Sequence, residues 1–171
     1  MSVCYQLVGV PGAGKSTWLD NQDWIKGFVS FGQTGINYWT PKSDYVIVST
    51  DYFVERFARR MGSTYSEVFD KVMPRAIRLM MRRVRKAQSE GRRIIWDQTS
   101  TTLASRKRKF NALPDYEHVA VVFKTPDWTE LERRLSNRPN KIVPLEVVKS
   151  MIDNFEMPTE AEGFKEIWYA D

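Results

Sequence analysis

The sequence predicts an α/β fold in which a parallel sheet of four to five strands is sandwiched by helices. Short apolar runs alternate along the chain with segments of helical periodicity, and the runs lie at 2–8, 45–49, 93–97, 118–123 and 166–169. The runs are almost continuously apolar, which is typical of parallel strands covered on both faces. A glycine-rich turn at 9–16 directly follows the first run, which indicates a strand–turn–helix unit.

The totals fit a single domain that spans residues 1–171. At 171 residues and 42% hydrophobic content, the chain can bury one sizeable core. No apolar run approaches the length of a membrane span, and the first strand begins too early for a secretory signal. We therefore expect a cytoplasmic protein with no membrane partner and infer no obligate protein partner. Cys4 is the only cysteine, so no internal disulfide can form, and we expect it to be buried.

The first helix is expected from Lys15 to about Trp24. The segment at about 27–43 mixes glycine, serine and aromatic residues and is long for a connection, so we interpret it as an insertion. It could be a hairpin or lid packed on its own aromatic rings, or a surface that stacks bases. A second helix is expected from Tyr52 to Met61, ending at Gly62.

A long helix is expected to begin after Ser63 or Thr64, with Glu67 placed to complete a capping box. Its apolar residues recur at helical spacing, and they are Val68, Phe69, Val72, Ala76, Leu79, Met80 and Ala87. Pro74 should kink this helix or restart it, because proline lacks the N–H of the helical hydrogen bond. Further helices are expected at 103–113, 129–137 and from Pro144 to about 155, without an internal repeat or domain linker.

The turn at 9–16 has two glycines four residues apart in Gly9-Val10-Pro11-Gly12-Ala13-Gly14-Lys15-Ser16, as in the phosphate-binding loop of P-loop proteins. Gly12 and Gly14 allow positive φ, so that the N–H groups around Ala13 can point inward at phosphate oxygens. The alternative is a glycine turn that binds nothing, which the complete spacing and both flanking elements oppose. The sequence thus predicts a P-loop NTPase of the kinase type that binds ATP.

The side chains that follow the glycines fit the same chemistry. Lys15 should reach the β- and γ-phosphates, and the Ser16 hydroxyl should hold Mg²⁺. Thr17 supplies a second hydroxyl, for which capping or packing of the helix is a better explanation than binding of the metal. We therefore place residues 12–17 in the nucleotide-binding site, with ATP and Mg²⁺ as cofactors.

Two carboxylates follow predicted strands, where ligands bind in a parallel sheet. Asp51 could accept a proton from an attacking hydroxyl, although an N-cap of the helix that begins at Tyr52 is the alternative. Asp97 could hold Mg²⁺ directly or through water, as a Walker B aspartate does. Its alternative is a capped turn with Thr99 and Ser100.

Arginines surround the end of the predicted helix at 129–137. Arg133, Arg134 and Arg138 lie in a segment at about 133–144 that we interpret as a lid over the phosphates. Such arginines can stabilise the charge of a transition state, whereas the alternative for at least one of them is a solvated helix face.

Positive charge is concentrated in the middle of the chain. The net charge is +5, and residues 75–109 contain twelve lysines and arginines against two acids, Glu90 and Asp97. This indicates a polyanionic partner such as nucleic acid, or else a solvated helix face.

Four groups of residues, in the same order along the chain, resemble the kinase domain of phage polynucleotide 5′-hydroxyl kinases. They are 10–17, Ser49-Thr50-Asp51, Asp97-Gln98-Thr99 with Arg106, and Ser136 to Pro144. The similarity covers most of the chain, and the stretch from Arg138 to Pro144, followed by Val147, Val148 and Met151, is its most family-specific part.

The resemblance implies transfer of the γ-phosphate of ATP to the 5′-hydroxyl of DNA or RNA, a reaction of nucleic-acid repair. It assigns the general base to Asp51, phosphate contacts to Lys15 and Arg138, and the metal to Ser16. From its place beside these residues we also expect Arg134 at the nucleotide. The remaining candidate contacts to substrate are Asp97, Thr99, Arg106 and Arg56.

This sequence departs from the family at Val54, where the family has an arginine that contacts the phosphate of the acceptor. Arg56, Arg59 or Arg60 could substitute for it. The chain also lacks the Asp-x-Asp signature of the 3′-phosphatase domain that some relatives carry.

Two further functions stay open at this point. One is a P-loop kinase for a small metabolite, a nucleoside or a sugar nucleotide, which the absence of an arginine at Val54 favours. The other is a nucleic-acid-binding module that uses ATP only as a switch, and the Asp51 carboxylate counts against it.

Overall fold

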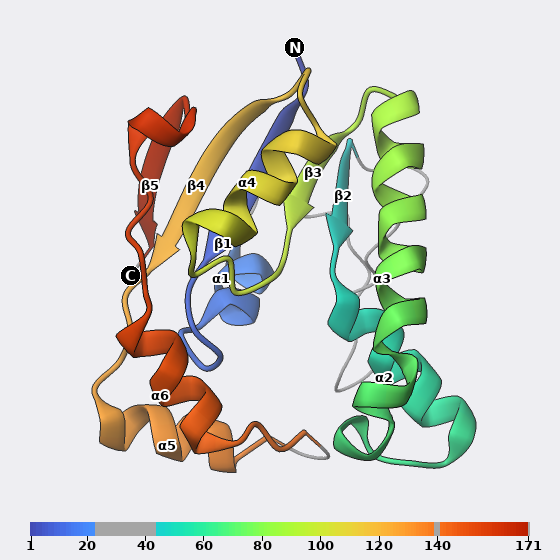
Figure 1. Ribbon diagram of the computed structural model, residues 1–171, viewed down its shortest axis with the longest axis vertical. Coiled ribbons are helices and arrows are strands. Elements are labelled where there is room, and N and C mark those ends of the chain that lie inside the picture. The colour runs from blue at the N-terminus through green and yellow to red at the C-terminus, as the bar shows by residue number, and fades with distance from the viewer. Residues whose placement is uncertain (23–43, 139–140, 171) are drawn as a thin grey trace.

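The computed structural model describes residues 1–22, 44–138 and 141–170. Its centre is a five-stranded parallel sheet, which confirms the parallel sheet of four to five strands that the sequence predicts. The strand order is β2-β3-β1-β4-β5 (Figure 1). The strands are β1 (Val3–Val8), β2 (Tyr45–Val48), β3 (Arg93–Trp96), β4 (Glu117–Phe123) and β5 (Glu166–Ala170). The predicted insertion at 27–43 lies outside the described residues.

Every ladder in the sheet is parallel, so all carboxyl ends meet at one edge. β1 is the central strand, and its Gln6 lies opposite Trp96 of β3 and Ala120 of β4. The segments that follow β1, β2 and β3 therefore begin side by side.

Helices cover both faces of the sheet. They are α1 (Lys15–Asn21), α2 (Thr50–Met61), α3 (Tyr65–Ser89), α4 (Leu103–Ala112), α5 (Trp128–Ser136), α6 (Leu145–Asp153) and the short 3₁₀ helix η2 (Glu160–Glu162). Residues of α2 and α3 pack on one face against Val46, Val48 and Ile94, and Phe110 of α4 packs on the same face farther along. Leu19 of α1 packs on the opposite face against Ile47 and Ile95 (Figure 1).

The second helix begins two residues earlier than the sequence predicts. Ser49 has the extended backbone of an N-cap, and α2 starts at Thr50. Asp51 therefore lies inside the first turn, and its interpretation as the N-cap of a helix from Tyr52 is wrong. Gly62 ends α2 with a φ of 62°, as predicted.

α3 is one continuous helix of 25 residues, so the predicted restart at Pro74 is wrong. Proline removes one donor, and the carbonyl that loses its partner belongs to Asp70, which is exposed to solvent as Pro74 is. The predicted capping box is present, because Thr64 accepts from the Glu67 amide and Glu67 accepts from the Thr64 amide.

The core is mostly apolar, and Cys4 is buried in it as predicted. Most of the predicted stripe of α3 is buried, but Phe69 is 36% exposed and packs against Tyr65 of the same helix. None of the helices in the described part of the chain combines the length and apolar character that crossing a membrane requires.

Candidate active site

The loop between β1 and α1 has the backbone that binds phosphate. Gly12 and Gly14 have φ values of 88° and 101°, in the region that other residues rarely adopt. A Cβ on Gly12 would also lie 2.7 Å from Leu131 Cδ1 of α5. The sequence therefore needs glycine at position 12 both for conformation and for the packing of α5 beneath the loop.

Lys15 lies over this loop, and its ammonium donates to the carbonyls of Gly9 at 2.7 Å and Val10 at 2.9 Å. Burial lowers the pKa of Lys15 to about 8, with a partly opposing effect of Asp97. Ser16 and Thr17 are exposed at the start of α1. Their hydroxyls thus lie beside the loop, where ligands of a nucleotide and its metal are expected.

Asp51 is held from two sides. Its Oδ1 accepts a hydrogen bond from the Tyr65 hydroxyl at 2.6 Å, and its Oδ2 lies 2.5 Å from Lys141 Nζ. Burial raises the pKa of Asp51, but the Lys141 charge, the two hydrogen bonds and the Lys15 charge outweigh it and hold this pKa below its ordinary value. Asp51 is therefore ionised at neutral pH, as a proton acceptor must be.

Two more carboxylates face the same region. Burial raises the pKa of Asp97 to about 6, against the lowering effect of Lys15. Burial also raises the pKa of Glu55, and the Asp51 and Asp97 charges raise it further while Lys141 lowers it. These mutual effects show that Asp51, Glu55 and Asp97 lie within electrostatic range of one another, and that Asp51 and Asp97 lie within range of Lys15.

The donor set fits a magnesium ion that is shared with a nucleotide. Mg²⁺ is usually held by one or two carboxylates together with substrate phosphates. Asp97 has no hydrogen-bonded side-chain partner within the described residues, and Ser16 presents an exposed hydroxyl. Ser16 and Asp97 are thus the residues of this chain that would hold the ion.

Two arginines of the segment at about 133–144, the predicted lid, lie near the site. Arg134 Nη1 donates to the Gly12 carbonyl at 3.1 Å, while Arg134 also pairs with Glu130. The Arg138 charge lowers the pKa of both Lys15 and Asp97, which places it within range of the site. Arg133 pairs with Glu130 and is largely exposed, so it fits its alternative interpretation as a residue of the helix surface.

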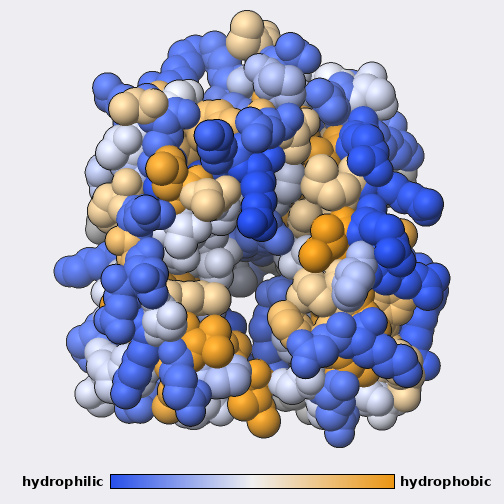
Figure 2. All heavy atoms as spheres, in the orientation of Figure 1, coloured by the Kyte–Doolittle hydropathy of each residue, from blue (hydrophilic) through white to orange (hydrophobic). Residues whose placement is uncertain are grey.

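Beyond the undescribed residues 139–140, the lid segment contacts α3. The Ser66 hydroxyl donates to the Ile142 carbonyl at 3.2 Å and accepts from the Ile142 amide at 3.0 Å. Figure 2 shows the molecular face hollowed between the α5–α6 side and the α2–α3 side, at the carboxyl end of the sheet. Lys141 and Ile142 therefore connect the two sides of this hollow.

Arg106 is not a substrate contact in this structure, which corrects the prediction. Its side chain is fully buried and forms a bidentate ion pair with Glu162, with nitrogen–oxygen distances of 2.7 Å. It also donates to the carbonyls of Ser100 and Glu156. The guanidinium therefore links α4 to Glu156 and Glu162 of the C-terminal segment and to the turn at Ser100. Ser100 itself has a positive φ of 50°.

Thr99 contacts the phosphate-binding loop through its backbone rather than its side chain. Its carbonyl accepts from the Gly9 amide at 2.8 Å, so the segment after β3 is tied directly to the phosphate-binding loop. This contact fixes the position of Asp97, two residues earlier, relative to Lys15.

The structure does not bring Arg56 to the site. Its side chain is exposed on α2, and at about 100° per residue it lies roughly 140° round the helix from Asp51. Glu55 lies much nearer, and the Arg59 charge lowers the Glu55 pKa, so Arg59 is on the site-facing side. Val54 is fully buried, which explains why this position does not carry an exposed arginine.

Sequence reasoning missed three residues of the site: Tyr65, Lys141 and Glu55. Glu55 follows Asp51 by four residues, a spacing that predicts a shared helix face. Lys141 lies inside the family-specific segment from Arg138 to Pro144. Tyr65 has no local signal, because its contact with Asp51 depends on how α3 folds back on α2.

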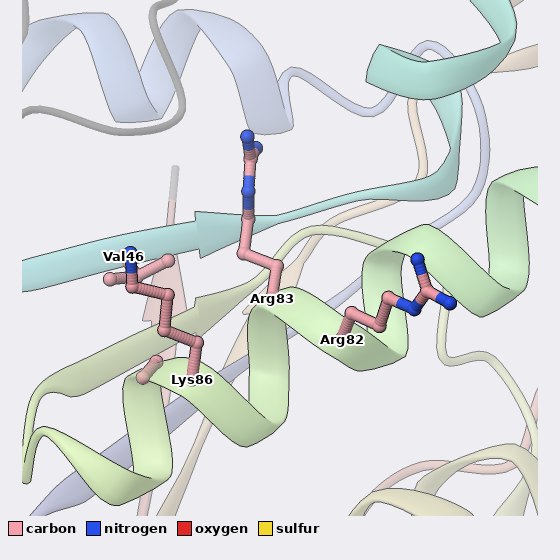
Figure 3. Close-up of a pocket in the computed structure, with 5 residues that line it drawn as sticks. Val46, Arg82, Arg83 and Lys86 are labelled. Carbon is pink, nitrogen blue, oxygen red and sulfur yellow. The ribbon is translucent and has the colours of Figure 1, made fainter.

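A separate pocket of about 250 Å³ lies away from these residues. It is lined by Val46, Arg82, Arg83, Lys86 and Ala87, between β2 and α3 (Figure 3). None of the candidate catalytic residues lines it, so we assign the chemistry to the carboxyl edge of the sheet.

Comparison with known proteins identifies the family and the fold of the chain. A family model described as an AAA domain matches residues 5–158. Among solved structures, a Pnkp1/Rnl/Hen1 complex matches with a TM-score of 0.55 and 20% identity over 83% of this chain and 41% of that chain. A structure of the PezAT toxin–antitoxin system of Streptococcus pneumoniae gives 0.60 and 18% over 100% of this chain and 70% of that chain.

Shikimate kinase from Acinetobacter baumannii in complex with shikimate gives a TM-score of 0.50 and 16% identity, over 100% of this chain and 84% of that chain. Identities this low show the fold alone. The chain spans 41% of the matched chain in the Pnkp1/Rnl/Hen1 complex. The family model, in contrast, matches most of the chain. The protein therefore belongs to this AAA domain family and has the α/β fold of the P-loop kinases.

Proposed function

We propose that the protein is an ATP-dependent phosphotransferase that phosphorylates the 5′-hydroxyl of a DNA or RNA strand. The observation that carries the transferase part is the convergence of Lys15, Asp51, Asp97 and Arg138 at one edge of the sheet. Phosphoryl transfer needs this combination of cations for the phosphates, a metal-binding carboxylate and a proton acceptor.

Each side chain has a role in this proposal. The amides of residues 12–17 and the Lys15 ammonium bind the β- and γ-phosphates, and Ser16 and Asp97 hold Mg²⁺, which neutralises phosphate charge when bound. Asp51 accepts the proton of the attacking hydroxyl. Arg134 and Arg138 stabilise the charge of the transferring phosphoryl group from the lid side.

The acceptor part of the proposal rests on exposed positive charge and on the family resemblance. α3 begins at Tyr65, which touches Asp51, and carries exposed basic side chains along its length. These are Arg75, Arg78, Arg82, Arg85 and Lys86, joined by Lys107 and Arg108 on α4. At 1.5 Å per residue, Arg75 to Arg85 lie about 15–30 Å along the helix from Tyr65, so a strand whose end is at Asp51 could follow this row.

A small-molecule acceptor is the second candidate, and the surroundings of Asp51 favour it. Position 54 is buried valine rather than an exposed cation, and the Glu55 carboxylate lies near Asp51. A carboxylate there repels an acceptor phosphate but tolerates a neutral hydroxyl. One protein of similar fold is a shikimate kinase solved with shikimate, which has hydroxyl groups available as acceptors.

The test is transfer of radiolabelled γ-phosphate from ATP with Mg²⁺ to a panel of acceptors. The panel contains a 5′-hydroxyl DNA oligonucleotide, the matching RNA, a free nucleoside and shikimate. We expect labelling of at least one oligonucleotide, with loss of most turnover in Asp51→Asn and full turnover in Asp70→Asn, an exposed aspartate of α3. Labelling of only the nucleoside or shikimate would favour the second candidate, and no labelling at all would contradict the transferase proposal.

A further inference from the structure

The Tyr65 hydroxyl makes a single polar contact among the described residues, and that contact is with the proposed catalytic base. Tyr65 is the first residue of α3 and is 8% exposed, and its hydroxyl donates to Asp51 Oδ1 at 2.6 Å. We propose that Tyr65 is a positioning residue of the phosphoryl transfer, which holds the Asp51 carboxylate in the orientation that accepts the proton. This inference rests on the proposed function of Asp51.

The tyrosine is itself fixed. Its ring packs against Phe69 with a centroid distance of 5.5 Å, and Lys141 Nζ lies 4.3 Å from the ring centroid. The capping box of Thr64 and Glu67 sets the start of α3 immediately beside it. A side chain held by packing on two sides and by its backbone can impose an orientation on its partner.

The chemistry requires the phenol to remain a donor. Burial, together with the Asp51 charge and hydrogen bond, raises the pKa of Tyr65 well above its ordinary value, so the hydroxyl stays protonated. Each carboxylate oxygen has two lone pairs, so Oδ1 can bind Tyr65 and still accept from a substrate hydroxyl. Tyr65 therefore restricts the rotation of the carboxylate without occupying it.

The first variant is Tyr65→Phe, which keeps the ring, its contact with Phe69 and the surface under Lys141. Since a hydrogen bond to a charged group in the right geometry is lost, we expect kcat to fall about tenfold to a hundredfold. The KM for ATP should stay unchanged, because the polar contact of Tyr65 is with Asp51 and not with the phosphate-binding loop. Tyr116→Phe is the matched control, since it removes another tyrosine hydroxyl bond, to the Arg92 carbonyl at 2.8 Å, and should retain full kcat.

The decisive measurement is a double-mutant cycle. If Tyr65 acts only through Asp51, Asp51→Asn with Tyr65→Phe should turn over no more slowly than Asp51→Asn alone. A purely structural role of Tyr65 would instead multiply the two losses. Thermal melting of Tyr65→Phe and Tyr116→Phe, compared side by side, shows whether the two variants are equally folded.

Two results would overturn the inference: wild-type kcat in Tyr65→Phe, or losses that multiply in the double variant. Both require an active wild-type enzyme that depends on Asp51. A wild-type protein that labels no acceptor, or whose Asp51→Asn variant is fully active, would contradict the proposed function itself. The two failures are therefore distinguishable.

Discussion

Lys141 Nζ lies 2.5 Å from Asp51 Oδ2, so an ion pair joins the segment that follows Arg138 to the first turn of α2. The two residues are 90 positions apart in the chain, Asp51 in α2 and Lys141 between α5 and α6, and these elements lie on opposite sides of the hollow at the sheet edge (Figure 2). The side chains are 18% and 44% exposed, so solvent screens the pair and its contribution to stability is modest. Its larger effect is on the proton affinity of Asp51.

Lys141→Met should move the acid limb of the kcat/KM profile to higher pH. The Lys141 charge and hydrogen bond lower the Asp51 pKa, so their removal raises it, and the base then loses its charge at a higher pH as pH falls. The other titratable groups that act on this carboxylate or its neighbours are Lys15, Glu55, Arg59, Tyr65, Asp97 and Arg138. They remain in the variant, so the shift reports Lys141 alone.

The matched control for this profile is Lys149→Met. Lys149 also lies over an aromatic ring, Trp128, at 4.8 Å, but it is on the exposed side of α6. Its profile should coincide with that of the wild type. An unshifted acid limb in Lys141→Met would show that the ion pair does not persist in the reacting complex.

Lys15→Ala and Ser16→Ala should each abolish phosphoryl transfer while leaving the circular dichroism spectrum unchanged. Lys15 supplies charge at the phosphate-binding loop, and losing such a contact to a transferring phosphate costs several kcal/mol. Ser16 is exposed and makes no side-chain hydrogen bond within the described residues, so its removal should not disturb the fold. Turnover near the wild-type rate in folded Lys15→Ala would contradict the kinase proposal.

The sheet and its site-bearing edge were predictable because they depend on local patterns. Near-continuous apolar runs indicate buried parallel strands, and parallel strands place the segments after Val8, Val48 and Trp96 at the same edge. Asp51 and Asp97 follow from that rule without knowledge of side-chain packing. The boundaries were less certain, as the earlier start of α2 at Thr50 shows.

The residues that could not be predicted depend on contacts between distant elements. Tyr65 reaches Asp51 only because α3 folds back on α2, and Lys141 reaches it only because its neighbour Ile142 is hydrogen-bonded to Ser66 of α3. Arg106 was misinterpreted for the converse reason, since its partner Glu162 is 56 positions away. In a sequence, a buried arginine paired over such a distance is indistinguishable from one that binds a phosphate.

Arg106→Ala should destabilise the fold by about 3–5 kcal/mol, because it leaves the Glu162 carboxylate buried without its partner. Chemical denaturation measures this loss, and Arg106→Met with Glu162→Met should recover part of it. Arg108→Ala, an exposed arginine of the same helix, should change the free energy of unfolding by less than about 0.5 kcal/mol. Unchanged stability in Arg106→Ala with a raised KM for the acceptor would restore Arg106 as a substrate contact.

Stability should fall at acid pH through His118. The imidazole is buried, its Nδ1 lies 3.0 Å from Gln6 Nε2, and its Nε2 lies 3.0 Å from the Leu113 carbonyl, an arrangement that suits the neutral ring. Burial lowers its pKa below the ordinary 6.5. The unfolded chain therefore binds a proton more readily, and stability present above about pH 6.5 is lost as pH falls.

Unfolding in urea at pH 5 and pH 8 tests this effect, with His118→Gln as the comparison. The variant lacks the titrating group, so its loss of stability between the two pH values should be smaller than that of the wild type. Equal losses in both proteins would assign the acid sensitivity to other groups.

The proposed nucleic-acid acceptor makes a prediction about salt. If Arg78, Arg82 and Arg85 contact the backbone of a single strand, log affinity should fall linearly with log salt, at a slope of about −0.7 for each contact. Replacing all three by glutamine should reduce the magnitude of this slope by about 2 and weaken DNA and RNA strands of any sequence alike. A neutral nucleoside or polyol acceptor releases no counterions, so its KM should not change with salt in either protein.

The measurement is KM for a 5′-hydroxyl oligonucleotide and for a nucleoside at two or more salt concentrations, with the exposed Lys149→Gln as a control on α6. A nucleoside used as well as the oligonucleotide, with no salt response for either, would assign the exposed arginines of α3 to solvation and favour the small-molecule kinase.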